Sequence, residues 1–181
     1  MPAPSLSIKT NLAGWALAFV NIEPEYEFAE DWSFNLPLYY SAWNYGHSRR
    51  KFRGISLMPG FRRYLTLPCD CCPVRFWLGA HAGIKWYNYA FGHNSDRYQD
   101  HDGDRPALGG GLDIGVHFRF RKGSPWSAEL GAGAGYYRLH YDIWRNGGCG
   151  DKIGERKGNK LMLDYLTLSL CYTFRLGGKE R

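Results

Sequence analysis

The sequence has no uninterrupted apolar run of about eighteen residues, which is the length that a transmembrane helix needs. It also has no phosphate-binding glycine loop, because Gly109-Gly110-Gly111 lies inside a strand-like stretch. No secretory signal peptide is visible, since Met1-Pro2-Ala3-Pro4 lacks a charged start and an apolar core. Helical membrane spans and a P-loop nucleotide site are therefore excluded. A membrane β-barrel is not, because it needs only every second residue to be apolar.

Alternation of apolar with polar or small residues is the dominant pattern of the chain. From Leu166 to Phe174 every even position is apolar and every odd position is small or polar, which indicates a strand with two unlike faces. Large aromatic residues recur at the same end of the apolar faces, and these are Phe28, Trp32, Phe76, Phe120, Trp126 and Phe174. The chain is 17% aromatic and holds 23 glycines. An aromatic girdle at one rim predicts an all-β antiparallel up-and-down barrel that spans an outer membrane. On this interpretation a signal peptide has been removed from the chain.

The pattern predicts about eight strands, the smallest usual number for such a barrel. We expect them near Leu6–Gly14, Asn21–Phe28, Trp32–Ala42, Gly54–Tyr64, Phe76–Tyr89, Ala107–Phe120, Trp126–Tyr137 and Leu161–Phe174. Residues 6–174 then form one barrel domain, between tails at 1–5 and 175–181. Long polar loops are expected at Asn44–Arg53, Ala90–Pro106 and Asp142–Lys160, with short turns at the other end. Bacterial outer-membrane barrels place such turns and both termini in the periplasm.

A soluble eight-stranded barrel of the lipocalin kind is the structural alternative, because alternation alone does not say which face points inward. Two features favour the membrane barrel. Small residues crowd the polar face, as at Gly131, Gly133 and Gly135, and suit a narrow filled lumen. Aliphatic bands such as that of Leu112, Ile114 and Val116 lie between the aromatic positions.

With the apolar face outward, parity alone gives the residues of the lumen. The titratable ones are Lys9, Glu23, Glu25, Glu27, Arg62, His81, Lys85, Asp113, His117, Arg119 and Glu129, with Asn11, Asn35 and Cys171 beside them. Four of these are basic, apart from the histidines, and five are acidic. Because unpaired charges in a poorly hydrated lumen cost several kcal/mol each, we expect ion pairs that close the pore. The Glu23-Glu25-Glu27 row could instead form a proton or cation path.

Several segments resemble a known family. Ile8-Lys9-Thr10-Asn11-Leu12, Ile22 to Glu27, Trp32 to Leu36, Tyr39 to Trp43 and Pro59 to Tyr64 carry the resemblance. They are similar to Bacteroidota outer-membrane barrel proteins of unassigned function, often encoded beside fimbrillin-type pilin genes. The resemblance implies a surface role in pilus or adhesin biogenesis, and it supplies no reaction. Family members carry paired cysteines in the last long loop, whereas only Cys149 stands here.

Other chemical signals are weak. The 5 cysteines form an odd number, and Cys69-Asp70-Cys71-Cys72 lacks the matching ligands of a zinc site, so a local disulfide or free thiols are expected. Asp96, Asp100, Asp102 and Asp104 resemble part of a calcium loop without its closing glutamate, which favours a solvated acidic loop. His93-Asn94-Ser95 is similar to the His-x-Ser pair of lipid A deacylases but falls in a loop. No metal, cofactor or catalytic set is predicted.

The net charge of +6 arises mainly in two expected outer loops. Their basic residues include Arg49, Arg50, Lys51 and Arg53 in the second, and Lys152, Arg156 and Lys157 in the fourth. At an outer surface these side chains could bind lipopolysaccharide phosphates or a partner such as a fimbrial protein, and no nucleic-acid-binding module accompanies them. The function expected is structural or assembly-associated and non-enzymatic. An enzyme acting on lipid A and a small-solute transporter are the alternatives.

Overall fold

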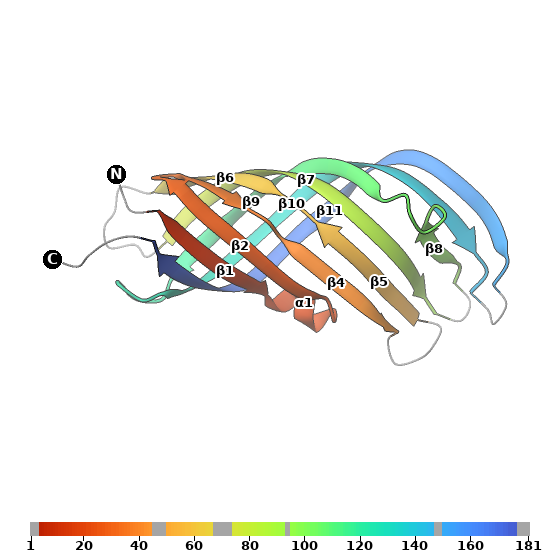
Figure 1. Ribbon diagram of the computed structural model, residues 1–181, viewed down its shortest axis with the longest axis horizontal. Coiled ribbons are helices and arrows are strands. Elements are labelled where there is room, and N and C mark those ends of the chain that lie inside the picture. The colour runs from red at the N-terminus through yellow and green to blue at the C-terminus, as the bar shows by residue number, and fades with distance from the viewer. Residues whose placement is uncertain (1–3, 45–49, 67–73, 93–94, 147–149, 177–181) are drawn as a thin grey trace.

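The computed structural model describes residues 4–44, 50–66, 74–92, 95–146 and 150–176. One antiparallel sheet contains all the strands of this part of the chain (Figure 1). In chain order they are β1 (Ser5–Asn11), β2 (Val20–Ala29), β3 (Trp32–Asn35), β4 (Leu38–Asn44), β5 (Arg50–Leu57), β6 (Gly60–Thr66), β7 (Val74–Phe91), β8 (Arg97–Asp100), β9 (Ala107–Arg119), β10 (Trp126–Trp144) and β11 (Lys152–Arg175).

The sheet closes on itself, because β1 pairs with β2 on one side and with β11 on the other. Three pairs of segments each act as one barrel strand. β3 and β4 both pair with β2, β5 and β6 both pair with β7, and β8 and β9 both lie between β7 and β10. The first two breaks fall at Pro37 and Pro59, which lack the N–H that a ladder needs. The eleven segments therefore make the eight-stranded antiparallel barrel that the alternation predicts.

The two faces of the wall have the polarity of a membrane barrel. Outward aliphatic side chains are unusually exposed, with Leu112 and Leu161 at 71% and Leu163 at 69%. The six girdle aromatics are exposed as well, and they lie at the end where Ser5 pairs with Arg175 (Figure 1). Inside, charged residues such as Lys9, Arg62 and Glu129 are buried. This arrangement rules out the lipocalin-like alternative, in which the interior would be apolar and the exterior polar.

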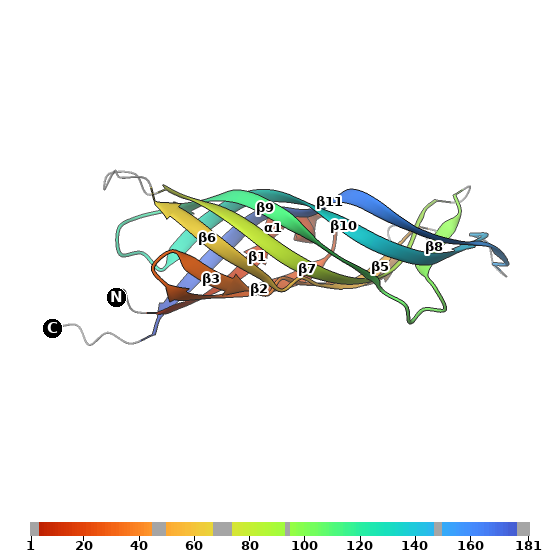
Figure 2. The ribbon, with the colours of Figure 1, turned by 90° about the horizontal axis from the view of Figure 1, so that it is seen from above.

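The wall is uneven in height. At the end of the barrel away from the chain termini, β7, β10 and β11 extend far beyond β1 and β2, as Figures 1 and 2 show. The expected loop at Asp142–Lys160 is therefore wrong, because β10 continues to Trp144 and β11 begins at Lys152. The loop expected at Ala90–Pro106 likewise contains β8, and β5 begins at Arg50, inside the loop expected at Asn44–Arg53. In the extension of β11 the residues are polar or glycine apart from Ile153. In that of β10 the polar residues take the parity that is apolar lower in the strand, so neither continues the pattern of the barrel.

The expected continuation of the first strand to Gly14 is also wrong. The short helix α1 (Leu12–Ala16) begins there, because the Asn11 side chain accepts hydrogen bonds from the backbone N–H groups of Ala13 and Gly14 at 3.0 and 3.4 Å. Leu12 and Trp15 of this helix are exposed. No helix in the described ranges is long and apolar enough to cross a bilayer.

Glycines make room for aromatic side chains in the lumen. The indole of Trp77 is fully buried beside Gly131, where an added Cβ would lie 2.6 Å from the Trp77 ring. Gly115 faces the same indole from β9. Tyr137 is packed similarly against Gly109 and Gly83. The predicted narrow and filled lumen is therefore built by pairing a large residue on one strand with small residues on its neighbours.

Candidate functional site

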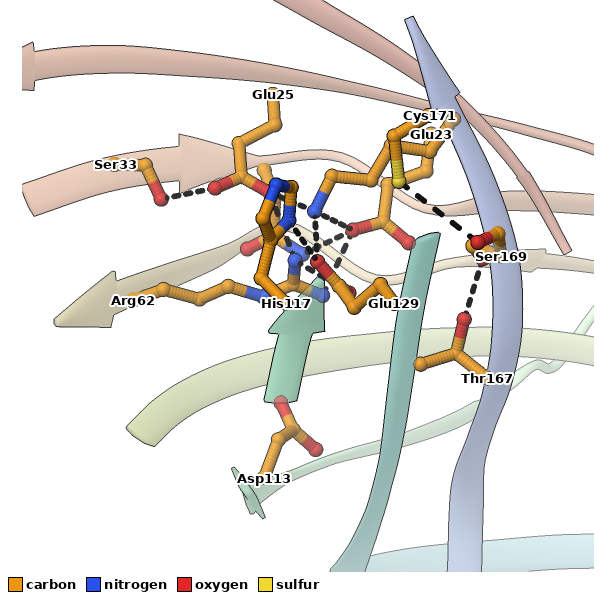
Figure 3. A network of polar contacts seen from close by, with 12 residues as sticks. Glu23, Glu25, Ser33, Arg62, Asp113, His117, Glu129, Thr167, Ser169 and Cys171 are labelled. Atoms are coloured by element: carbon orange, nitrogen blue, oxygen red, sulfur yellow. Dashed lines mark hydrogen bonds and ion pairs between the residues drawn. The ribbon is translucent and has the colours of Figure 1, made fainter. Parts of the chain in front are cut away.

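A buried charge network crosses the half of the lumen that is nearer to the chain termini. Lys9 on β1 forms ion pairs with Glu25 of β2 and Glu129 of β10 (Figure 3). Arg62 on β6 lies 2.8 Å from Glu25 and 3.1 Å from Glu129, and its second terminal nitrogen lies 2.7 Å from Glu23. All five side chains are at most 5% exposed. Sequence parity thus identified every charged member of this central network.

Neutral groups complete the network. The phenol of Tyr64 and the hydroxyl of Ser33 donate to Glu25 Oε1 at 2.5 and 2.6 Å. Tyr165 receives a 2.6 Å hydrogen bond from Arg62 and donates to Glu23 at 3.1 Å. These bonds satisfy carboxylate lone pairs that would otherwise be buried without partners, which is the condition for an ionic core to be tolerated.

The central network holds three carboxylates and two permanent cations. The imidazole of His117 lies beside them, with Nδ1 3.6 Å from Glu129 Oε2. The guanidinium of Arg62 also lies over the Trp77 ring, with the carbon Cζ 4.2 Å from the ring centroid. The fully buried indole and the ion pairs are thus packed against each other inside the barrel.

A second buried network lies in the lumen farther from the chain termini than the central network. His81 bridges two carboxylates, with Nδ1 2.9 Å from Asp113 and Nε2 2.8 Å from Asp164. The Tyr137 hydroxyl donates to the same Asp164 oxygen at 2.6 Å, and Lys85 Nζ lies 3.4 Å from it. The sequence prediction placed His81, Lys85 and Asp113 in the lumen correctly. It missed Asp164, which contacts both His81 and Lys85.

Two predicted members do not belong to either network. Arg119 is exposed, so its place in the buried plug is wrong. It lines a cavity of about 660 Å³ at the short-turn end of the barrel, where the wall ends and solvent enters. Glu27 faces the same cavity, and its side chain is 30% exposed. Its partner is Arg75, 2.7 Å away, a residue that the inward parity of β7 indicates but the prediction left out.

The basic residues predicted for the outer loops lie mostly on strands. Arg50, Lys51 and Arg53 belong to β5, and Lys152, Arg156 and Lys157 belong to β11, whereas Arg49 is outside the described residues. Burial, with the positive charges of Arg97 and Arg53, lowers the pKa of Lys51. The positive charges of β5 and of Arg97 on β8 therefore lie near one another beside β7, with which both strands pair.

A histidine and carboxylate cluster lies on the part of β8, β10 and β11 that rises above β9. We call this part, formed by Arg97–Asp100, residues 140–144 and residues 152–158, the outer ribbon. His101 follows β8 directly, and its Nδ1 lies 2.8 Å from Asp142 of β10. His140 on β10 lies 2.7 Å from Glu155 of β11. Sequence spacing gave no sign of this cluster, because its members come from three segments.

Hydrogen bonding holds the carboxylates of the outer ribbon in their charged form. Burial acts to raise the pKa of Asp142, but hydrogen bonds from Lys152 and His101 outweigh it and bring the pKa to about 2. The hydrogen bond from His140 lowers the pKa of Glu155. The same contact with Asp142 raises the pKa of Lys152. The carboxylates of the cluster are thus ionised at neutral pH, and the ammonium group of Lys152 lies beside them.

The aspartates, the His-x-Ser pair and the cysteines that the sequence singled out lie in several different places. Asp100 is buried and accepts a hydrogen bond from the Tyr87 backbone at 3.2 Å, so it is not part of a solvated acidic loop, whereas Asp104 is exposed. The Ser95 hydroxyl donates to the Gly92 carbonyl at 2.9 Å, and His93 lies outside the described residues. Cys171 is fully buried, as expected, and carries a free thiol. The other four cysteines lie outside the described ranges.

This geometry defines a closed antiparallel β-barrel with an apolar exterior and a lumen filled by polar side chains. The chain belongs to the family described as protein of unknown function (DUF3575), whose profile matches residues 1–174. No curated protein matches the chain. Among solved structures it is similar to Neisserial surface protein A, at 14% identity, with 96% of this chain and 93% of that chain covered and a TM-score of 0.45. The barrel itself follows from the closed ring of strand pairs described above.

Proposed function

We propose that this protein is a closed, non-conducting barrel of a bacterial outer membrane that holds the outer ribbon at the cell surface. The observation that carries the proposal is the central network, in which Lys9 and Arg62 join β1, β2, β6 and β10 across the lumen with almost no exposure. A transport channel needs a hydrated path, whereas these side chains occupy the path themselves.

The exterior supports the membrane location. Leu112, Ile114 and Leu130 on neighbouring strands are 71%, 59% and 52% exposed, and in water such a contiguous apolar surface would promote aggregation. In a bilayer the same surface faces lipid, and the aromatic rim lies at the interface. The short turns and both termini would then lie in the periplasm, and the outer ribbon outside the cell.

The role at the surface is structural or assembly-associated, and it involves no catalysis. The basic side chains on β5 and β11 lie at the outer end, where they can bind lipopolysaccharide phosphates by charge-assisted hydrogen bonds. The outer ribbon offers three paired strands to a surface protein. A fimbrial subunit or adhesin is the partner that the resemblance to Bacteroidota barrel proteins implies.

Planar-bilayer recording tests the proposal. Purified wild-type protein should show no steady conductance. Replacing Glu23, Glu25 and Glu27 together with alanine should leave Lys9 and Arg62 without most of their carboxylate partners. The variant should therefore either conduct ions or be less stable than the wild type. The matched control replaces the exposed Asp96, Asp104 and Asp151 with alanine, and it should stay silent and stable.

The other outcomes separate the alternatives. Steady conductance by the wild-type barrel would overturn the proposal and favour small-solute transport. Release of acyl chains during incubation with lipopolysaccharide would instead favour an enzyme acting on lipid A. Identical gel mobility before and after boiling, together with solubility without detergent, would contradict the membrane location, because a closed barrel resists mild detergent until it is heated.

A further inference from the structure

Two histidines face each other across adjacent strands of the outer ribbon. The pairing of Tyr141 with Asp100 sets the register that brings His140 opposite His101, and the His101 N–H donates to the His140 carbonyl at 3.1 Å. Their rings are stacked, with centroids 3.7 Å apart and planes inclined by 20°. The stack therefore brings a nitrogen of each ring within 4.8 Å of a nitrogen of the other.

A carboxylate from the third strand reaches the same point. Glu155 on β11 lies diagonally across from His140, with Oε1 2.7 Å from His140 Nε2 and Oε2 3.9 Å from His101 Nδ1. One donor atom from each of these three residues lies within 4.8 Å of the others. A single ion could therefore contact all three after small side-chain movements, since its bonds to nitrogen and oxygen are about 2.0–2.2 Å long.

We propose that His101, His140 and Glu155 form a binding site for a divalent transition-metal ion of the zinc class. Two imidazoles and one carboxylate suit zinc, copper or nickel, whereas calcium and magnesium prefer sites made of oxygen alone. The set leaves a coordination position for water or for a group from a partner. The site goes beyond the proposed function, because it would bind metal in a folded barrel whether or not the lumen conducts.

Asp142 positions the metal-binding histidine. Its Oδ1 lies 2.8 Å from His101 Nδ1, which leaves Nε2, 3.1 Å from the exposed Asp102 carboxylate, as the nitrogen that would bind the ion. The Asp142 Oδ2 accepts the backbone N–H of Asp102 at 3.1 Å. The Asp142 side chain is 2% exposed, so the imidazole is held against a rigid partner. Metal-binding histidines commonly have such a carboxylate behind them, and its removal weakens metal affinity about 10–100-fold.

Two ammonium groups compete with the ion. Lys152 Nζ lies 2.7 Å from Asp142 and 3.7 Å from Glu155, and Lys157 Nζ lies 3.5 Å from Glu155. Lys157 is 67% exposed on its side chain and can turn into solvent when an ion binds. Lys152 stays close to the cluster, so its charge should weaken binding. Lys152→Gln should therefore bind the ion more tightly than the wild type.

Isothermal titration of untagged, detergent-folded protein with zinc chloride tests the site. Accessible thiols are alkylated first, because cysteines also bind zinc. We expect one site in the wild type, affinity at least about tenfold weaker in His101→Ala and His140→Ala, and a loss of about 10–100-fold in Asp142→Asn. Asp151→Asn, which removes an exposed carboxylate at the hairpin end, should bind like the wild type.

Boiled and unboiled gel mobility shows that each variant is folded before titration. Equal zinc affinity in the wild type and in the folded His101→Ala/His140→Ala double variant would overturn the site, and so would an absence of binding in the wild type. An affinity for calcium as high as that for zinc would also contradict it. Channel recordings do not enter this test, so its failure is distinguishable from failure of the proposed function.

Discussion

Asp164 and Tyr165 are consecutive residues of β11, yet both side chains point into the lumen. The Asp164 side chain is 0% exposed and Tyr165 is 3% exposed. The register shows why: Tyr165 pairs with Gly133 and Leu163 pairs with Ala134, so Asp164 is the extra residue of a β-bulge. Leu163 and Leu166 on either side remain outside. The bulge thus adds an acidic group to the lumen without disturbing the apolar outer surface.

Asp164 links three strands through its one carboxylate. It contacts His81 and Lys85 of β7 and Tyr137 of β10. Asp164→Asn keeps the shape and removes the charge, so it leaves two basic groups with weaker partners. We expect a loss of about 3 kcal/mol or more in unfolding free energy, measured by urea unfolding in lipid vesicles. Asp151→Asn, at an exposed position, should change it by less than about 0.5 kcal/mol. Equal effects would contradict the bridging role.

The second prediction concerns Arg62, which contacts all three carboxylates of the central network. Arg62→Met should lower the unfolding free energy by about 3–5 kcal/mol, because it leaves buried carboxylates short of a cation. Arg53→Met, on the exposed face of β5, should cost less than about 1 kcal/mol. The same urea titration compares the two, and a similar loss in both would show that the network does not stabilise the barrel.

Much of the barrel could be predicted because a pleated strand has a period of two. That single rule predicted the barrel, its apolar outward-facing residues and the buried positions of Lys9, Arg62 and Glu129. It failed at Asp164, because a bulge changes the parity of a strand without any mark in the sequence. It failed at Arg119 for another reason: parity gives the direction of a side chain and not its distance from the end of the barrel.

The third prediction concerns packing in the lumen. A Cβ on Gly115 would overlap the Trp77 indole and lie 2.6 Å from the Leu130 carbonyl oxygen. Gly115→Ala should therefore cost about 1–3 kcal/mol in unfolding free energy, through displacement of a fully buried ring. Gly158→Ala is the control, because nothing lies within 4 Å of the added carbon. In a Trp77→Leu background the Gly115→Ala cost should shrink, and an unchanged cost would assign it to the backbone instead.

The outer ribbon could not be predicted from periodicity. Above the apolar band the residues of β11 are polar or glycine apart from Ile153, and the polar residues of β10 take the parity that is apolar lower in the strand. The alternation of the barrel is therefore not continued, although the backbone pairing runs on from Tyr137 to Trp144. His101, His140 and Glu155 are separated in sequence and are brought together only by the registers of three strands. A paired structure was therefore mistaken for a loop, and a side-chain cluster that depends on the pairing stayed hidden.

The last prediction uses the low pKa of Asp142. A carboxyl group with a pKa of about 2 in the folded protein and about 3.9 in the unfolded chain stabilises the fold above pH 4. That stabilisation is lost as the pH falls from about 4 to 2, because the unfolded chain binds the proton first. The difference in unfolding free energy between wild type and Asp142→Asn should therefore be constant from pH 6 to 5 and approach zero near pH 2. Urea titrations of both proteins across this range measure it. Other carboxylates titrate equally in the two proteins and cancel in the difference, so a difference that stays constant down to pH 2 would show that Asp142 is not held ionised by His101 and Lys152.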